Sequence, residues 1–238
     1  HPPVIFVAID PCGGGASQFA IASMFFVSRK GNSMKDKLEF VLCGSENQYA
    51  QNHNDVKRIV LSHVKGLRLL HPPSQICVGI ESNLGMEASN ISQMLKHEQD
   101  VFCLEESKKR DGMYGAGFTT TYARKIQYYE ILHMALSRNI IHICNRYVSD
   151  DTDATLKVLQ QQMSAFKKIL SKPTSAFTPE KQTFSGKVDG TGRMAPDRLC
   201  DDLLLAVQMV LFISLLVVDD KAISCPRSSY TKISIQYD

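Results

Sequence analysis

Residues 4–15 read Val4-Ile5-Phe6-Val7-Ala8-Ile9-Asp10-Pro11-Cys12-Gly13-Gly14-Gly15. The first part is an unbroken apolar run, which is typical of a strand buried on both faces of a sheet. Asp10 ends this run, directly before a proline and a glycine-rich turn. A carboxylate at that point lies at the rim of the sheet, where a site can form. The stretch therefore predicts a central strand that carries an acid at its carboxyl end.

The segments that follow predict further strands of the same sheet. Residues 19–27 and 38–42 are rich in β-branched or aromatic side chains, so we expect them to form an antiparallel meander with the first strand. Shorter apolar runs at 76–80 and 101–104 lie on either side of a helical segment. A meander followed by alternating strands and helices predicts an α/β fold, with a mixed central β-sheet flanked by α-helices on both faces.

Apolar residues recur at helical spacing between and after these strands. The first expected helix is capped by Asn54 or Asp55 and ends before Pro72, and others span 86–96, 121–138 and 155–170. We expect irregular structure at 108–115 and 171–193, where glycine, proline and charged residues gather.

The most apolar stretch of the chain is 203–218. It is shorter than the roughly 18 residues that a membrane span needs, and Gln208 and Ser214 interrupt it. We therefore expect a buried final helix, which starts near Asp197, and no membrane partner.

Composition sets broad limits on the class of protein. The chain has 238 residues, 44% of them apolar and 21% charged, with a net charge of +3. These values predict one globular domain, 1–238, and they permit a nucleic-acid partner without demanding one. The seven cysteines form no CxxC pair, which argues against a disulfide framework and a zinc site and favours a reducing intracellular compartment. Because the chain opens with His1, we expect it to be an excised part of a longer protein.

Three further acids echo Asp10. Glu81 directly follows the expected strand 76–80, and Asp201 and Asp202 lie near the start of the last helix. If strand 76–80 is the parallel neighbour of the first strand, Asp10 and Glu81 project from adjacent strand ends. Carboxylates that lie this close stay ionised at neutral pH only when divalent cations neutralise them. Oxygen ligands favour Mg²⁺ or Mn²⁺, which predicts phosphoryl-transfer chemistry.

Asp201 and Asp202 cannot face one metal site equally, because neighbours on a helix point about 100° apart. We favour Asp201 as the direct ligand and Asp202 as a weaker or supporting one. Each acid also has a structural interpretation: Asp10 can begin a turn, and Asp201 or Asp202 can complement a helix N-terminus. We expect Asn83 to cap the helix that follows it rather than to bind a metal.

The order and separation of these acids carry a family resemblance. The strings that carry it are Ile9-Asp10-Pro11, Gly79-Ile80-Glu81-Ser82-Asn83, Phe184-Ser185-Gly186-Lys187 and Asp201-Asp202-Leu203. Over nearly the whole chain, the sequence resembles the C-terminal nuclease domain of herpesvirus terminase large subunits, within the ribonuclease H-like superfamily. Two features depart from that pattern: the glycine-rich turn after Asp10 and the additional acid Asp197.

The resemblance implies a metal-dependent DNA endonuclease that cuts concatemeric viral DNA during genome packaging in the host cell nucleus. Two Mg²⁺ or Mn²⁺ ions about 3.5 to 4 Å apart would act on the scissile phosphate, with Asp10 between them, Glu81 on one and Asp201 on the other. Its implied partners are double-stranded DNA, other terminase subunits and the portal, and an N-terminal ATPase motor would precede this domain.

Basic residues are the candidate DNA contacts. Lys187, in a glycine-flanked turn before the last helix, is expected either to approach the scissile phosphate or to position the strand beside it. The basic loop of Lys108, Lys109 and Arg110 is either a second DNA contact or a solvated charge run. Salt dependence of DNA binding distinguishes the two interpretations.

Two other functions are compatible with parts of the sequence. An actin-like ATPase or sugar kinase also ends its first strand in Asp followed by glycine, but it needs a second nucleotide-binding half for which 238 residues leave little room. The chain has no GxxxxGK[ST] loop, so it carries no P-loop motor. Alternatively, the acids are structural and the domain is a non-catalytic docking or DNA-binding module.

Overall fold

The computed structural model describes residues 1–11, 18–29, 37–50, 52–83, 86–107, 114–171, 181–185 and 201–219. Its strands are β1 (Val4–Asp10), β2 (Phe19–Arg29), β3 (Lys37–Gln48), β4 (Gln75–Ile80), β5 (Val101–Cys103), β6 (Glu105–Ser107), β7 (Tyr114–Ala116), β8 (Ile141–Ile143), β9 (Lys167–Ser171) and β10 (Lys181–Ser185). Its helices are α1 (His53–Leu70), α2 (Met86–Leu95), α3 (Tyr122–Ser137), α4 (Thr152–Ala165) and α5 (Asp202–Asp219).

A six-stranded mixed sheet with the strand order β5-β4-β1-β2-β3-β8 organises the fold. Strands β1, β2 and β3 form the expected antiparallel meander. Strands β4 and β5 extend the sheet in parallel from β1, and β8 pairs in parallel with β3. The predictions of an α/β fold and of a first strand within the sheet interior are both confirmed.

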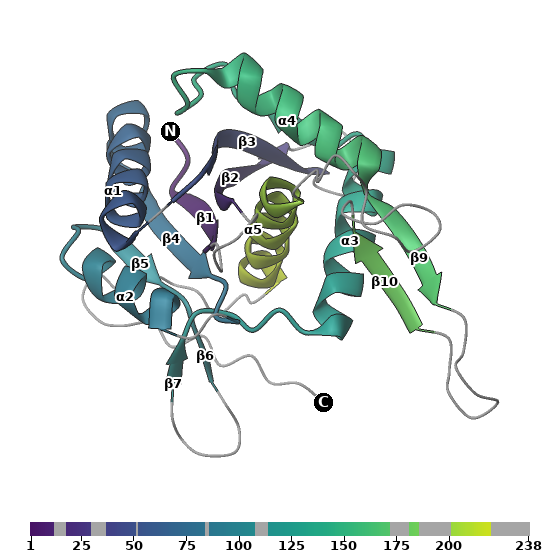
Figure 1. Cartoon of the computed structure of the whole chain (residues 1–238). Coiled ribbons are helices and arrows are strands. Elements are labelled where there is room, and N and C mark those ends of the chain that lie inside the picture. The colour runs from purple at the N-terminus through teal and green to yellow at the C-terminus, as the bar shows by residue number, and fades with distance from the viewer. Residues whose placement is uncertain are drawn as a thin grey trace.

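Side-chain alternation along β1 divides the core between the two faces of the sheet. Ile5, Val7 and Ile9 pack into a cluster with residues of α1 and α2. Phe6 and Ala8 pack into a second cluster with residues of α3, α4 and α5. Figure 1 shows this arrangement, with α1 and α2 on one side of the sheet and α5 against the other. Both faces of β1 are therefore dry, as its unbroken apolar sequence predicts.

Helix α5 is the buried helix that the apolar stretch 203–218 predicts. It packs directly on β1 and β2, and α3 and α4 lie against it. Gly79 of β4 permits this close approach, since a Cβ there would lie 2.2 Å from Ile213 Cδ1 of α5. Among the helices that the structure describes, none combines the length and the apolar character of a membrane span.

Three helices begin at other residues than the sequence predicts, and the last of them, expected to start near Asp197, begins at Asp202. Asn52 caps α1, because its side chain accepts from the backbone N–H groups of Asn54 and Asp55. The two residues expected as caps therefore belong to the helix. The helix predicted over 155–170 begins earlier, at Thr152, and ends at Ala165.

The residues that follow α4 form β9 instead of another helical turn. Phe166 has extended backbone angles, and Lys167–Ser171 pairs with β10. The helical spacing of apolar residues in this segment is misleading, because pairing with β10 determines its conformation. Strand β10 itself lies in the stretch 171–193, which the sequence predicts to be irregular. The strands β6, β7 and β8 were not predicted either, since three residues each are too few to show a period. Other parts of the expected irregular segments lie outside the described residues.

Candidate functional site

The carboxyl ends of β1 and β4 lie side by side at one edge of the sheet. The two strands are parallel, with Ile9 opposite Ile80, and the backbone N–H of Glu81 donates to the Ile9 carbonyl oxygen at 2.8 Å. Asp10 and Glu81 are the next residues in this register. The structure thus places both acids at neighbouring strand ends, as the sequence predicts.

The same alternation that divides the core also sets the face on which each acid lies. Phe6 and Ala8 belong to the cluster beneath α5. Asp10 is the next alternate residue of β1 and lies on the same face of the sheet. On β4, Cys77 packs against that same cluster and a Cβ on Gly79 would touch α5. Because side chains alternate between the two faces of a strand, Glu81 lies on the same face as residues 77 and 79. Both carboxylates therefore lie on the α5 face. They are largely buried, with exposed fractions of 6% for Asp10 and 7% for Glu81.

Helix α5 brings a third acid to this edge. Asp202 is buried at the first turn of α5, and the backbone N–H of Gln18 donates to its Oδ2 at 2.7 Å. Gln18 directly precedes β2, whose Ala20 lies opposite Asp10. Asp202 is thereby held at the edge where β1 ends. Asp201 precedes the helix and is less buried, and our preference for Asp201 as the direct ligand stays a prediction.

A short extended segment covers the end of β4 and supports Glu81 from the other side. Phe118 N–H donates to the Ile80 carbonyl at 2.6 Å, and Ser82 N–H donates to the Phe118 carbonyl at 2.8 Å. Gly117 enters this segment with φ of +86°, and a Cβ there would lie 2.3 Å from Ile80 O. Only glycine combines that backbone conformation with such close contact.

Asn83 is a residue at the site whose role the sequence did not reveal. Its side chain bonds to Glu81 and, in both directions, to the backbone of Thr120. The observed bonds cross to a segment distant in sequence. Residues 84 and 85 lie outside the described residues, so the expectation that Asn83 caps the next helix stays a prediction. The nearest signal in the sequence is its position two residues after Glu81, which alone does not predict the contact.

The donor chemistry at this edge suits a divalent cation, although the observed arrangement is not a complete ligand set. Asp10, Glu81 and Asp202 offer only oxygen ligands, which Mg²⁺ and Mn²⁺ prefer. Within the described ranges, however, no group of three or more His, Cys, Asp or Glu side chains is arranged to hold a metal ion. In this arrangement Asp202 accepts from Gln18, and Glu81 accepts from Asn83.

The basic residues named as DNA contacts fall outside the part of the chain that the structure describes. These residues are Lys108, Lys109, Arg110 and Lys187. Their proposed roles stay predictions.

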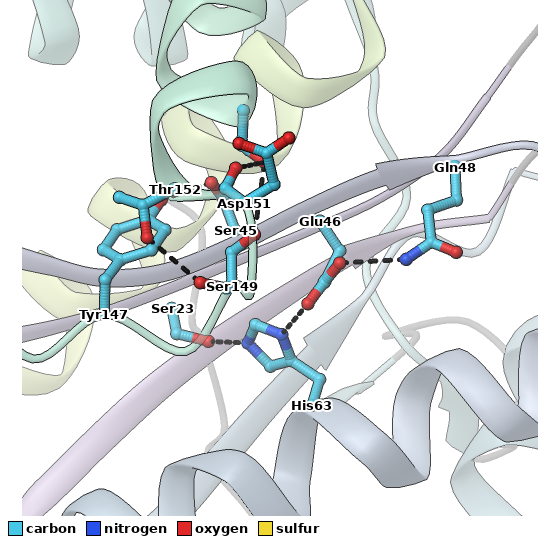
Figure 2. Close-up of polar contacts among 10 residues, drawn as sticks. Ser23, Ser45, Glu46, Gln48, His63, Tyr147, Ser149, Asp151 and Thr152 are labelled. Carbon is cyan, nitrogen blue, oxygen red and sulfur yellow. Dashed lines mark hydrogen bonds and ion pairs between the residues drawn. The ribbon is translucent and has the colours of Figure 1, made fainter.

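A second polar cluster lies on the opposite face of the sheet. Ser23 Oγ and His63 Nε2 are hydrogen-bonded at 2.5 Å, and His63 Nδ1 lies 3.6 Å from Glu46 Oε1 (Figure 2). The order hydroxyl, imidazole and carboxylate is that of a nucleophile with its base. Ser23 is nevertheless 0% exposed in the middle of β2, so no substrate reaches its hydroxyl. The cluster ties α1 to β2 and β3 instead.

Glu46 is the acidic member of this second cluster. Burial alone would raise the pKa of Glu46, but the neighbouring His63 imidazole and the Gln48 side chain lower it below its usual value. The carboxylate is therefore ionised at neutral pH, which favours the contact with His63.

The architecture and the acidic edge together define the class of fold. The six-stranded mixed sheet with helices on both faces matches the ribonuclease H-like fold of terminase nuclease domains. Among solved structures, the human cytomegalovirus terminase nuclease domain, Mn-soaked and inhibitor-bound, matches with a TM-score of 0.61 and 14% identity, over 90% of this chain and 83% of that one.

Two further structures of the same viral domain give the same result. The Mn-soaked structure matches with a TM-score of 0.61 and 14% identity, over 97% of this chain and 88% of that one. A third structure of the domain matches with a TM-score of 0.59 and 14% identity, over 89% of this chain and 83% of that one. No protein-family model and no curated protein matches the sequence. The likeness establishes a terminase nuclease-like fold.

Proposed function

We propose that the chain is a divalent-metal-dependent endonuclease that hydrolyses phosphodiester bonds of double-stranded DNA. The observation that carries this proposal is the placement of Asp10, Glu81 and Asp202 at one edge of the sheet. Asp10 and Glu81 share the α5 face, and Asp202 opens α5 itself. The terminase nuclease-like fold supports the same function, and two of the matching structures were soaked with Mn.

The residues at this edge have separable roles in the proposed reaction. Asp10, Glu81 and either Asp201 or Asp202 would hold the two cations. When bound, Mg²⁺ or Mn²⁺ supplies an activated water and stabilises the leaving oxygen. The buried position of the carboxylates restricts their movement, and the dry core beneath them keeps their geometry fixed. Lys187 would contact the DNA backbone near the scissile phosphate.

The biological setting belongs to the same proposal. The chain would cut concatemeric viral DNA during genome packaging, in the host cell nucleus, together with other terminase subunits and the portal. An N-terminal ATPase motor in the longer protein would drive translocation. The fold likeness to a viral terminase nuclease domain supports this setting.

Plasmid cleavage tests the proposed activity. The purified protein is incubated with supercoiled plasmid and Mn²⁺, beside Asp10→Asn and Glu81→Gln, which keep the shape of each side chain. Each variant should lose about 100-fold or more in rate, the scale of removing one group that stabilises the transition state. Glu87→Gln is the matched control, because Glu87 is a carboxylate on α2 that pairs with His53. Cleavage that persists in both site variants contradicts the proposal.

A non-catalytic DNA-binding module is the second candidate, and one observation favours it. Within the described part of the chain, the acids do not form a three-residue metal group. Calorimetric titration with Mn²⁺ separates the candidates. Binding that Asp10→Asn or Glu81→Gln abolishes supports the nuclease, whereas DNA binding without Mn²⁺ binding supports the module.

A further inference from the structure

Asn83 connects Glu81 to the backbone of a segment that is 37 residues further along the chain. Its Nδ2 donates to Glu81 Oε1 at 3.0 Å and to the Thr120 carbonyl oxygen at 3.2 Å. In return, the Thr120 N–H donates to Asn83 Oδ1 at 3.0 Å. These bonds use both hydrogens of the amide and one acceptor position on its oxygen.

The backbone of Thr120 determines which way the Asn83 amide points. An N–H group can only donate and a carbonyl can only accept, so Oδ1 must face Thr120 N and Nδ2 must face Thr120 O. The remaining hydrogen of Nδ2 is then directed at Glu81. The group presented to the Glu81 carboxylate is therefore a fixed donor.

We propose that Asn83 is a positioning residue that holds Glu81 in the orientation needed to bind a divalent cation, an inference that rests on the proposed function. A glutamate has three side-chain torsions, and fixing them before the metal arrives reduces the entropy lost on binding. Hydrogen-bond partners of metal-binding carboxylates act in this way, and their loss typically weakens metal binding by about 10 to 100-fold. The donor also leaves the second carboxylate oxygen, Oε2, outside this contact.

The chain provides a matched control for this inference. Ser82 Oγ and Thr119 Oγ1 are hydrogen-bonded at 3.3 Å, and this contact joins the same two segments. It does not involve a carboxylate. Removing the Ser82 hydroxyl therefore weakens the connection between the segments without changing the donor at Glu81.

The experiment measures Mn²⁺ binding by calorimetry in the wild type, Asn83→Ala, Ser82→Ala and Glu81→Gln. Asn83 is exposed, so its truncation leaves no internal cavity, and circular dichroism and thermal unfolding verify the fold. Asn83→Ala should weaken Mn²⁺ binding about 10-fold, whereas Ser82→Ala should bind as the wild type does. With saturating Mn²⁺, the KM for plasmid should be unchanged in Asn83→Ala, because Asn83 acts through Glu81 and not on DNA.

Each possible result supports or overturns the inference. Equal Mn²⁺ affinity in Asn83→Ala and the wild type, with binding lost in Glu81→Gln, overturns the role of Asn83 and leaves the proposed function standing. Equal weakening in Asn83→Ala and Ser82→Ala also overturns it, since a general loosening of the segments would then suffice. Absence of Mn²⁺ binding to the wild-type protein overturns the proposed function and this inference together.

Discussion

A methyl group added at Gly79 should destabilise the protein by displacing the fully buried Ile213 side chain of α5. The Cβ of Gly79→Ala would lie 2.2 Å from Ile213 Cδ1 and 3.2 Å from Phe118 Cε2. Carbon atoms in contact ordinarily lie about 3.5 to 4.0 Å apart, so the first contact requires a movement of roughly 1.5 Å. Overpacking a dense core in this way costs about 1 to 3 kcal/mol in the free energy of unfolding.

Shortening Ile213 should relieve the strain, because Ile213→Val removes the Cδ1 atom that clashes. Alone, Ile213→Val costs about 0.5 to 1.5 kcal/mol through lost burial. In the double variant the added methyl occupies part of the vacated space, since Ile213 Cγ1 lies at an ordinary 3.4 Å from the position that the new Cβ would take. We therefore expect the double variant to be more stable than the sum of the single effects by about 1 kcal/mol or more.

Urea unfolding of the four proteins measures this coupling, with the m-value as a check that each unfolds as one cooperative unit. Additive effects within about 0.5 kcal/mol would refute the reasoning. They would mean that the Gly79 methyl is accommodated by backbone movement elsewhere and does not press on α5.

Three further predictions follow from other contacts. Gly117→Ala should cost about 2 kcal/mol or more because the alanine must keep a positive φ and approach Ile80 O, and urea unfolding within about 0.5 kcal/mol of the wild type would contradict this. Burial and a nearby arginine lower the pKa of His71 below 6.5. The contribution of His71 to stability is therefore complete above that pH and is lost as the pH falls below it. His71→Phe should flatten the pH dependence of the unfolding free energy between about pH 7.5 and 5.5. An unchanged slope would exclude His71 as the source of that pH dependence. Burial acts to raise the pKa of Glu46, but the His63 imidazole lowers it below 4.5. The contribution of Glu46 to the stability of the folded protein should therefore disappear as the pH falls below that value. Glu46→Gln should remove this acid dependence in thermal melts.

The central elements and two of the acids could be predicted from sequence because each depends on a local pattern. The apolar run before Asp10 and the run before Glu81 report strands that are buried on both faces. The apolar stretch from 203 to 218 reports a helix enclosed by other elements, and α5 spans it. In each case the apolar residues extend over enough positions for a periodic or an unbroken apolar pattern to be recognised.

The contacts that hold Asn83 and Asp202 could not be predicted, because each joins segments that are distant along the chain. Asn83 lies 37 residues from its partner Thr120, and Asp202 lies 184 residues from Gln18. Strand β9 has a helical apolar spacing, but pairing with β10 determines its conformation. Local preference is overridden wherever a partner supplies hydrogen bonds that the isolated segment lacks.

The position of the acids is a consequence of how the core packs. In β1, Phe6 and Ala8 lie on the same face as Asp10 and pack into the cluster beneath α5. The side chains between them, Ile5, Val7 and Ile9, lie on the other face and pack with residues of α1 and α2. A shift of one residue in strand register would exchange these two sets and would turn Asp10 toward α1. Both faces of β1 are occupied by bulky side chains, so such a shift would disrupt two well-packed clusters at once. Selection for a stable core therefore also maintains the side of the sheet on which Asp10 and Glu81 meet.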